Sequence, residues 1–269
     1  MFVNKKANIL IVSMARCGSS AILELIKNSC EKESYTFFEP TEEIFRSQIL
    51  TCCNGESRTI VKVILRPHLK YEKNVHGLFP KTIGLTRDPR DNLISRLFFR
   101  LISDPFKINQ QIYEKIIPVL EKKIENPNSI SVVQIFRIME ESGLMEKMID
   151  KRVEENLSLF MDWHNRNLSA FIFSYEKFVL GEFTDLSDYL ELAIEHISDL
   201  KVDRPEIKRA GKFGEWKNWF TSEDVAFFKP RMEMFMRRYS YPLDWNLPEN
   251  QKINPITSID YIKKYTGIE

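Results

Sequence analysis

Five short runs of β-branched and aromatic residues alternate with stretches whose apolar residues follow helical spacing. The runs lie at residues 8–13, 34–38, 59–65, 81–86 and 170–174. Strands that are separated by helical segments usually pair in parallel, because a parallel connection has to cross over the sheet and a helix provides the crossover. The sequence therefore predicts an α/β fold with a parallel sheet flanked by helices.

Between residues 106 and 168 the pattern changes to helices alone. Apolar residues recur there at helical spacing, as in Ile112, Ile116 and Leu120. A chain of 269 residues can bury one large core. We therefore expect a single domain over residues 1–269, with a helical insert at about 106–168.

A later helix is expected from Ser222, as its N-cap, towards Arg238. Pro230 lies inside this helix and should bend it. A shorter helix is expected near residues 259–264.

The first predicted strand ends in a turn of small residues before an apolar helix. Backbone N–H groups at a helix start have no partner within the helix and lie at the positive end of its dipole. Such a turn binds a phosphate by geometry as well as by charge, although taken alone it is equally typical of a simple tight turn. The turn and the first helical residues are Arg16, Cys17, Gly18, Ser19 and Ser20.

A second strand, turn and helix follows at residues 82–95. Asp88 is placed as the N-cap, Pro89 as the first helical residue and Asp91 as a partner in a capping box. Arg87 leaves the strand end beside this helix. Alone, the segment is also compatible with a well-capped surface helix and nothing more.

Together the two segments resemble the sulfotransferases that use 3′-phosphoadenosine 5′-phosphosulfate (PAPS). The first matches as strand-Arg-Cys-Gly-Ser-Ser-helix, and the second as Arg-Asp-Pro-Arg-Asp with Ser95 eight residues after Arg87. The resemblance is closest in style to bacterial and Golgi-type carbohydrate members. It implies a P-loop-like fold in which the first turn holds the 5′-phosphosulfate, while Arg87 and Ser95 bind the 3′-phosphate.

Two further segments are similar to this family and occur in the family's order. Residues 208–217 resemble the loop that closes over the nucleotide, which implies nucleotide contacts for Arg209 and Gly211. Ala210 stands where the family usually has Lys, and Glu215 where it has Asp. Residues 173–176 resemble a stretch whose Tyr, here Tyr175, lies near the adenine.

Two cations are expected to act on the group in transfer. Arg16 occupies the family's usual Lys position in the first turn, so it would neutralise charge on the 5′-phosphate as the sulfuryl group departs. Lys62 is similar to a strand lysine that many members aim at the sulfuryl group. The alternative for Lys62 is a strand-end lysine whose ammonium reaches water.

The general base is expected to be Glu39. Cytosolic members place a His two residues after the strand lysine, but this chain has Ile64 there. Glu39 resembles a Glu-Pro step of Golgi-type and bacterial members, and burial beside two phenylalanines favours proton acceptance by a carboxylate. The alternative is a loop residue that caps the helix begun by Thr41. His68 is the second candidate for the base.

The sequence thus predicts transfer of the sulfuryl group of PAPS to a hydroxyl of a small-molecule or carbohydrate acceptor. Adenosine 3′,5′-bisphosphate (PAP) would be the product, and no metal is required. A P-loop kinase is an alternative, but Gly-x-x-x-x-Gly-Lys-Ser/Thr is absent. A non-catalytic nucleotide- or glycan-binding module remains the other alternative.

Composition narrows the possible partners. Lys and Arg number 39 against 38 Asp and Glu, so no global positive field favours nucleic acid. The four cysteines show no paired metal-ligand spacing, which predicts a reduced, cytoplasmic protein. The apolar run at 9–12 is too short for a membrane span and lacks the layout of a signal peptide. Acceptor identity and oligomeric state are not predicted.

Overall fold

The computed structural model describes residues 6–30, 34–66, 77–102, 110–143, 149, 151–195 and 209–267. The chain divides into two compact units. The first comprises Met1–Arg87 and Ser158–Asp203, and the second comprises Asp88–Leu157 and Arg204–Glu269. This division does not test the expected single domain, which stays a prediction.

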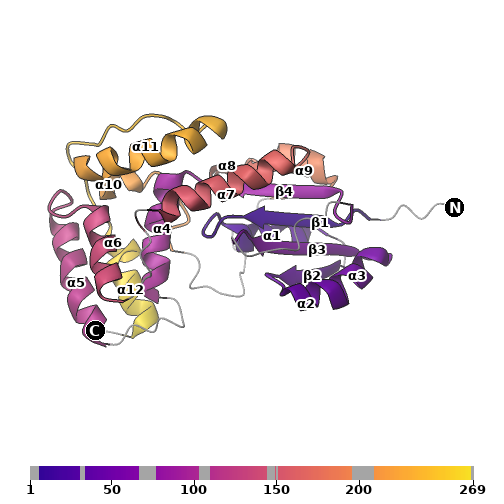
Figure 1. The fold of residues 1–269 in the computed structure, drawn as a ribbon, viewed down its shortest axis with the longest axis horizontal. Coiled ribbons are helices and arrows are strands. Elements are labelled where there is room, and N and C mark those ends of the chain that lie inside the picture. The colour runs from indigo at the N-terminus through magenta and orange to yellow at the C-terminus, as the bar shows by residue number, and fades with distance from the viewer. Residues whose placement is uncertain are drawn as a thin grey trace. The chain divides into compact units, whose positions relative to one another are not determined.

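The first unit is built on a five-stranded sheet in which every neighbouring pair is parallel. The order is β2-β3-β1-β4-β5, and Figure 1 shows β1 between β3 and β4. The predicted parallel α/β sheet is confirmed, and each predicted strand agrees with the structure to within one residue at either end. The strands are β1 Ile9–Ser13, β2 Ser34–Phe38, β3 Arg58–Ile64, β4 Lys81–Thr86 and β5 Phe171–Ser174.

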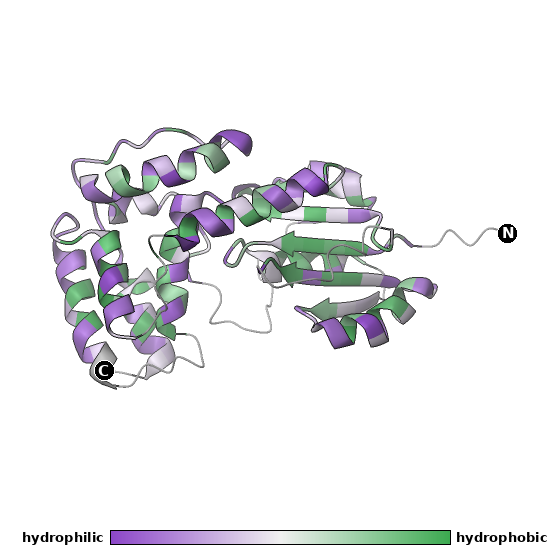
Figure 2. Cartoon of the chain, viewed as in Figure 1, coloured by the Kyte–Doolittle hydropathy of each residue, from purple (hydrophilic) through white to green (hydrophobic). Residues whose placement is uncertain are grey.

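The central strands are buried and the edge strand β2 is not. Every residue of β1 is buried, and Figure 2 shows this strand as hydrophobic over most of its length. Gly84 of β4 allows close packing, because a Cβ there would come within 2.7 Å of both Trp163 and Ile172. The carboxyl ends of parallel strands form the edge where ligands of α/β proteins bind.

Helices flank this sheet, as expected. Helix α1 packs on β1 and β3, α3 packs on β3, and α8 and α9 pack on β5. A π-helical turn, Phe45–Ile49, joins α2 to α3. The helices are α1 Ser19–Ser29, α2 Glu42–Ile44, α3 Leu50–Asn54, α7 Arg152–Arg166, α8 Tyr175–Leu180 and α9 Thr184–Leu190, and the first residues of α7 belong to the second unit.

The second unit is helical in the residues that the structure describes. Figure 1 shows α5, α6, α4 and α12 beside one another, with α12 packed on both α4 and α5. Helix α11 packs on α6 and α4. Together with α7, helices α5 and α6 occupy the stretch expected as a helical insert. The elements are α4 Pro89–Ile102, α5 Gln110–Glu125, α6 Val132–Glu141, α10 Trp216–Trp219, α11 Ser222–Arg238, a 3-10 turn Pro255–Thr257 and α12 Ile259–Thr266.

One buried carboxylate, that of Asp224, caps two helices of the second unit. It accepts from the backbone N–H groups of Val132 and Val133, both at 2.9 Å, at the start of α6. It also closes a capping box with Thr221, which is the N-cap of α11 in place of the expected Ser222. Burial raises the pKa of Asp224, and the backbone hydrogen bonds from Thr221, Val132 and Val133 oppose this shift.

A buried ammonium lies in the same region. Lys123 of α5 donates to the carbonyl oxygens of Pro127 and Ile130, the latter at 2.6 Å. Burial lowers the pKa of Lys123 to about 8, and the charge of Asp224 opposes that shift. The ammonium thus secures the turn between α5 and α6.

Replacement of Lys123 by methionine is expected to change how stability depends on pH. The pKa of this lysine is about 8 in the folded protein, against 10.5 for an unperturbed lysine, so between these values the unfolded chain binds the extra proton. The free energy of unfolding therefore gains a contribution that rises with pH across this window and that the Met variant lacks. Urea denaturation measures this contribution at about pH 7.5, 9 and 10.5, a series that spans the window between the two pKa values.

Lys122→Met, at the exposed neighbouring position, is the matched control and should leave the pH dependence as in the wild type. The expectation would be contradicted if the free energy of unfolding of the wild type did not rise with pH relative to that of Lys123→Met.

Candidate functional site

The turn between β1 and α1 has the geometry of an anion cradle. Gly18, the N-cap of α1, has a φ of 77° and supplies no side-chain cap, and the first turn of the helix holds no acidic residue. Arg16 also has a positive φ, 69°, a conformation that few non-glycine residues adopt. The N–H groups at the start of α1 thus lack a side-chain cap, and this arrangement suits a phosphate.

Arg87 and Tyr175 pack against this turn. Arg87 Nη1 donates to the carbonyl oxygen of Arg16 at 3.1 Å, and its guanidinium lies 4.2 Å from the centroid of the Tyr175 ring. The ring also abuts Gly18, where a Cβ would come within 2.6 Å of Tyr175 Cδ2. The structure therefore brings together the turn, Arg87 and Tyr175.

Two buried polar atoms near the turn, Arg87 Nε and Ser13 Oγ, have no hydrogen-bond partner among the residues that the structure describes. Arg87 is 6% exposed, so its unpaired Nε–H is held away from water. Leaving a buried donor unpaired is unfavourable. A phosphate or sulfate at this strand end would offer the acceptor that Arg87 Nε lacks.

A second cluster lies at the carboxyl ends of β2 and β3. Glu39 follows β2, and its backbone N–H donates to the carbonyl oxygen of Lys62 at 2.8 Å. Lys62 Nζ donates to Glu39 Oε1, and Arg66 Nη2 lies 3.2 Å from Glu39 Oε2. The alternative in which Lys62 reaches water is wrong, because its side chain is 2% exposed.

The backbone at Glu39 is unusual in the same way as that at Arg16. Glu39 has a φ of 44°, and Arg16 and Glu39 are two of the four non-glycine residues with positive φ in the described part of the chain. Strained conformations of this kind concentrate at functional sites. The alternative in which Glu39 caps the next helix is wrong, because Thr41 Oγ1 accepts from the N–H of Ile44 in that role.

Sequence reasoning did not predict the pairing of Arg66 with Glu39. The residue follows β3 by two positions, and nothing in its local pattern separates it from an ordinary surface arginine. The signal that could have found it is register. Phe38 pairs with Lys62, so residues just beyond the two strand ends must lie close together.

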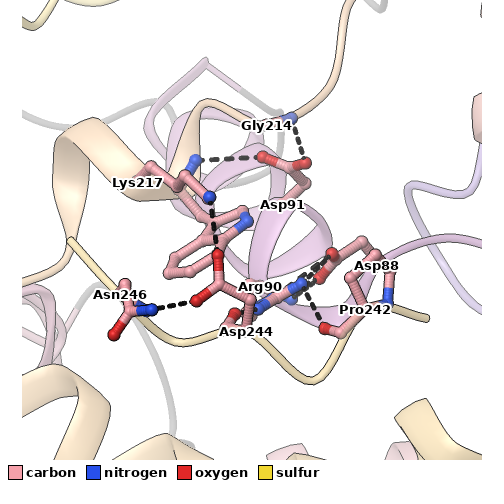
Figure 3. A network of polar contacts seen from close by, with 9 residues as sticks. Asp88, Arg90, Asp91, Gly214, Lys217, Pro242, Asp244 and Asn246 are labelled. Atoms are coloured by element: carbon pink, nitrogen blue, oxygen red, sulfur yellow. Dashed lines mark hydrogen bonds and ion pairs between the residues drawn. The ribbon is translucent and has the colours of Figure 1, made fainter. Parts of the chain in front are cut away.

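In the second unit, a polar network holds the start of α4 (Figure 3). Asp88 Oδ1 accepts from the backbone N–H of Arg90 at 2.9 Å, which confirms Asp88 as the N-cap. Arg90 also donates to the carbonyl oxygens of Pro242 and Asp244. The first turn of α4 is thereby tied to the C-terminal segment.

Asp91 binds the loop that resembles the family's nucleotide-closing loop. Its carboxylate accepts from the backbone N–H of Gly214 at 2.5 Å and from that of Trp216 at 3.0 Å (Figure 3). Asp91 of α4 is thereby joined to a segment that is distant in the sequence. Those contacts fix the loop by its backbone.

Three predicted nucleotide-binding residues belong to the second unit. Ser95 is buried on α4, and Gly211 is exposed with a φ of 62°. Arg209 pairs with Glu215 and donates to the carbonyl oxygen of Thr257 at 2.7 Å. A phosphate contact by Arg209 would therefore have to compete with an existing ion pair.

His68, the second candidate for the base, lies outside the described residues. In the ranges that the structure describes, no group of three His, Cys, Asp or Glu is arranged to hold a metal ion. Likewise, none of the described helices has the length and apolar character needed to cross a membrane.

Residues 6–178 match the family model described as the sulfotransferase domain. Among solved structures, mouse sulfotransferase SULT7A1 complexed with PAP is similar, with a TM-score of 0.55 and 16% sequence identity. That match covers 87% of this chain and 85% of the mouse chain. No curated protein matches this sequence.

Proposed function

The chain belongs to the sulfotransferase domain family, and from that premise we propose that it transfers the sulfuryl group of PAPS to a hydroxyl of a small-molecule or carbohydrate acceptor. The observation that supports this most is the turn after β1. An uncapped helix start, a cation at Arg16 and the unpaired Nε of Arg87 together suit a phosphorylated nucleotide.

In the proposed binding mode, the residues that follow β1 and β4 hold the phosphates of the nucleotide. N–H groups from Cys17 to Ser20 hold the 5′-phosphosulfate, and Arg16 stabilises charge on the leaving phosphate. Tyr175 lies near the adenine, and Arg87 binds the 3′-phosphate. Ser95, Gly211 and Arg209 are proposed as further 3′-phosphate contacts by their resemblance to the family, with Arg209 first leaving Glu215.

The proposed chemistry is a single displacement at sulfur. The acceptor oxygen bonds to sulfur while the bond from sulfur to the phosphate oxygen breaks, so PAP departs with the electron pair. Glu39 takes the proton of the hydroxyl, and Lys62 stabilises the negative charge of the sulfuryl group in transit. No metal is required in this scheme.

Ligand preference tests this function against that of a kinase. Calorimetry should detect PAP binding in EDTA, and labelled PAPS should be consumed in the presence of an acceptor mixture of phenols and glycans. Binding of ATP with Mg²⁺ in place of PAP without it would contradict the proposal.

Arg87→Ala is expected to weaken PAP binding by about 2–4 kcal/mol, because a charge-assisted phosphate contact and a buried donor are lost. AMP, which has no 3′-phosphate, should lose much less. Calorimetry on the two ligands measures the difference, and Arg46→Ala, at an exposed arginine after α2, serves as the control. An equal loss for PAP and AMP would mean that Arg87 does not bind the 3′-phosphate.

A further inference from the structure

Two cations hold the carboxylate of Glu39, one on each oxygen. Lys62 contacts Oε1 and Arg66 contacts Oε2. Both oxygens of this carboxylate are therefore already engaged. An acceptor hydroxyl gains an unoccupied oxygen of Glu39 when one of the two cations moves to another partner.

The two cations differ in how readily they can move. The Lys62 side chain is 2% exposed, whereas that of Arg66 is 54% exposed. Among the described residues Arg66 contacts Glu39 through one nitrogen, and a guanidinium has further N–H donors to offer to a ligand. Exposed ion pairs are weak, so Arg66 is the cation that an incoming group can take over.

An exposed aromatic ring adjoins the same carboxylate. Phe38 directly precedes Glu39 and is 45% exposed. It pairs in register with Lys62, whose ammonium lies 3.8 Å from the ring centroid. The ring is thus fixed beside the base, where it can pack against the ring of a sugar or a phenol.

Resting on the function proposed above, we propose that Arg66 binds a carboxylate of the acceptor. In such an acceptor the carboxylate and the reacting hydroxyl lie close together on one ring. The guanidinium fork matches a carboxylate in a bidentate contact. That contact draws Arg66 away from Glu39 and places the hydroxyl next to the freed oxygen. A neutral acceptor leaves Arg66 on Glu39 and gains neither effect.

Matched pairs of acceptors that differ in this one charge test the inference. The pairs are 3-hydroxybenzoate with 3-hydroxybenzamide, and 4-nitrophenyl β-D-glucuronide with 4-nitrophenyl β-D-glucoside. Binding to the PAP-loaded protein and kcat/KM with PAPS are measured for wild type, Arg66→Gln and Arg66→Lys. Arg46→Gln is the control, because Arg46 is also exposed and also pairs with a glutamate, Glu42.

The wild type and the Arg46→Gln control are expected to favour the acid of at least one pair by about 10- to 100-fold, the range of a charge-assisted hydrogen bond. Arg66→Gln should bring the ratio of acid to neutral acceptor close to one. Arg66→Lys, which keeps the charge but loses the fork, should give an intermediate ratio.

Two results would overturn the inference, whichever acceptor proves to be active. One is an acid preference that survives Arg66→Gln, and the other is a PAP-loaded wild type that binds neither acid more tightly than its neutral partner. The proposed function fails by a different observation, the absence of PAP binding. The two failures are therefore distinguishable.

Discussion

Glu39→Gln is expected to lower the rate of sulfuryl transfer by about 10²–10⁴-fold, the usual contribution of a general base. Glutamine keeps the shape of the side chain and an oxygen for Lys62, but it cannot take the proton of the acceptor. PAP binding should be preserved, because Glu39 is not among the residues proposed to bind the nucleotide. Single-turnover transfer from labelled PAPS to an acceptor that is active with wild type measures the effect.

Two variants accompany this measurement. Glu42→Gln, at an exposed glutamate in the first turn of α2, should keep the wild-type rate. His68→Asn should lower the rate far less than Glu39→Gln. If the Gln variant is nearly as fast as wild type while His68→Asn is slow, the base is His68.

Asp224→Asn is expected to lower the free energy of unfolding by about 3–5 kcal/mol, as for the loss of one partner in a buried charged network. The amide presents its NH₂ group to N–H donors that need an acceptor, so part of the capping of α6 and α11 is lost. The buried ammonium of Lys123 also loses its nearby negative charge. Urea denaturation at pH 7 measures the change.

Glu223→Gln provides the matched control. Glu223 adjoins Asp224 in the first turn of α11 but is exposed, so this variant should differ from wild type by about 0.5 kcal/mol or less. A loss of the same size in both variants would show that the two caps at Asp224 are not the source of the stability.

Local chemistry was enough to predict the strands and several helix starts. β-branched runs between helical stretches specify buried parallel strands, and Asp88 before Pro89 is an N-cap followed by the favoured first helical residue. The N-cap of α11 is Thr221, one residue before the expected Ser222. Thr221 occupies the N-cap position because its hydroxyl accepts from the backbone N–H of Asp224, while the carboxylate of Asp224 accepts from the backbone N–H of Thr221.

Contacts between distant segments explain what the sequence could not predict. The turn after β1 was recognisable because all its parts are adjacent in the chain, and Arg87 by its place at a strand end. The two cations on Glu39 depend on the pairing of β2 with β3, which no local pattern encodes. Asp91 likewise contacts backbone groups more than one hundred residues away.

Anchoring by Asp91 affects how freely the sequence of residues 209–216 can vary. The carboxylate binds backbone N–H groups of Gly214 and Trp216, which every residue type except proline provides. Side chains at Ala210, Lys212 and Phe213 can then be exchanged without releasing the segment from α4. Ala210 stands where the family resemblance implies a lysine, so this position lacks a charge while the attachment stays intact. If this stretch binds the nucleotide as proposed, it is a suitable place to engineer altered nucleotide affinity.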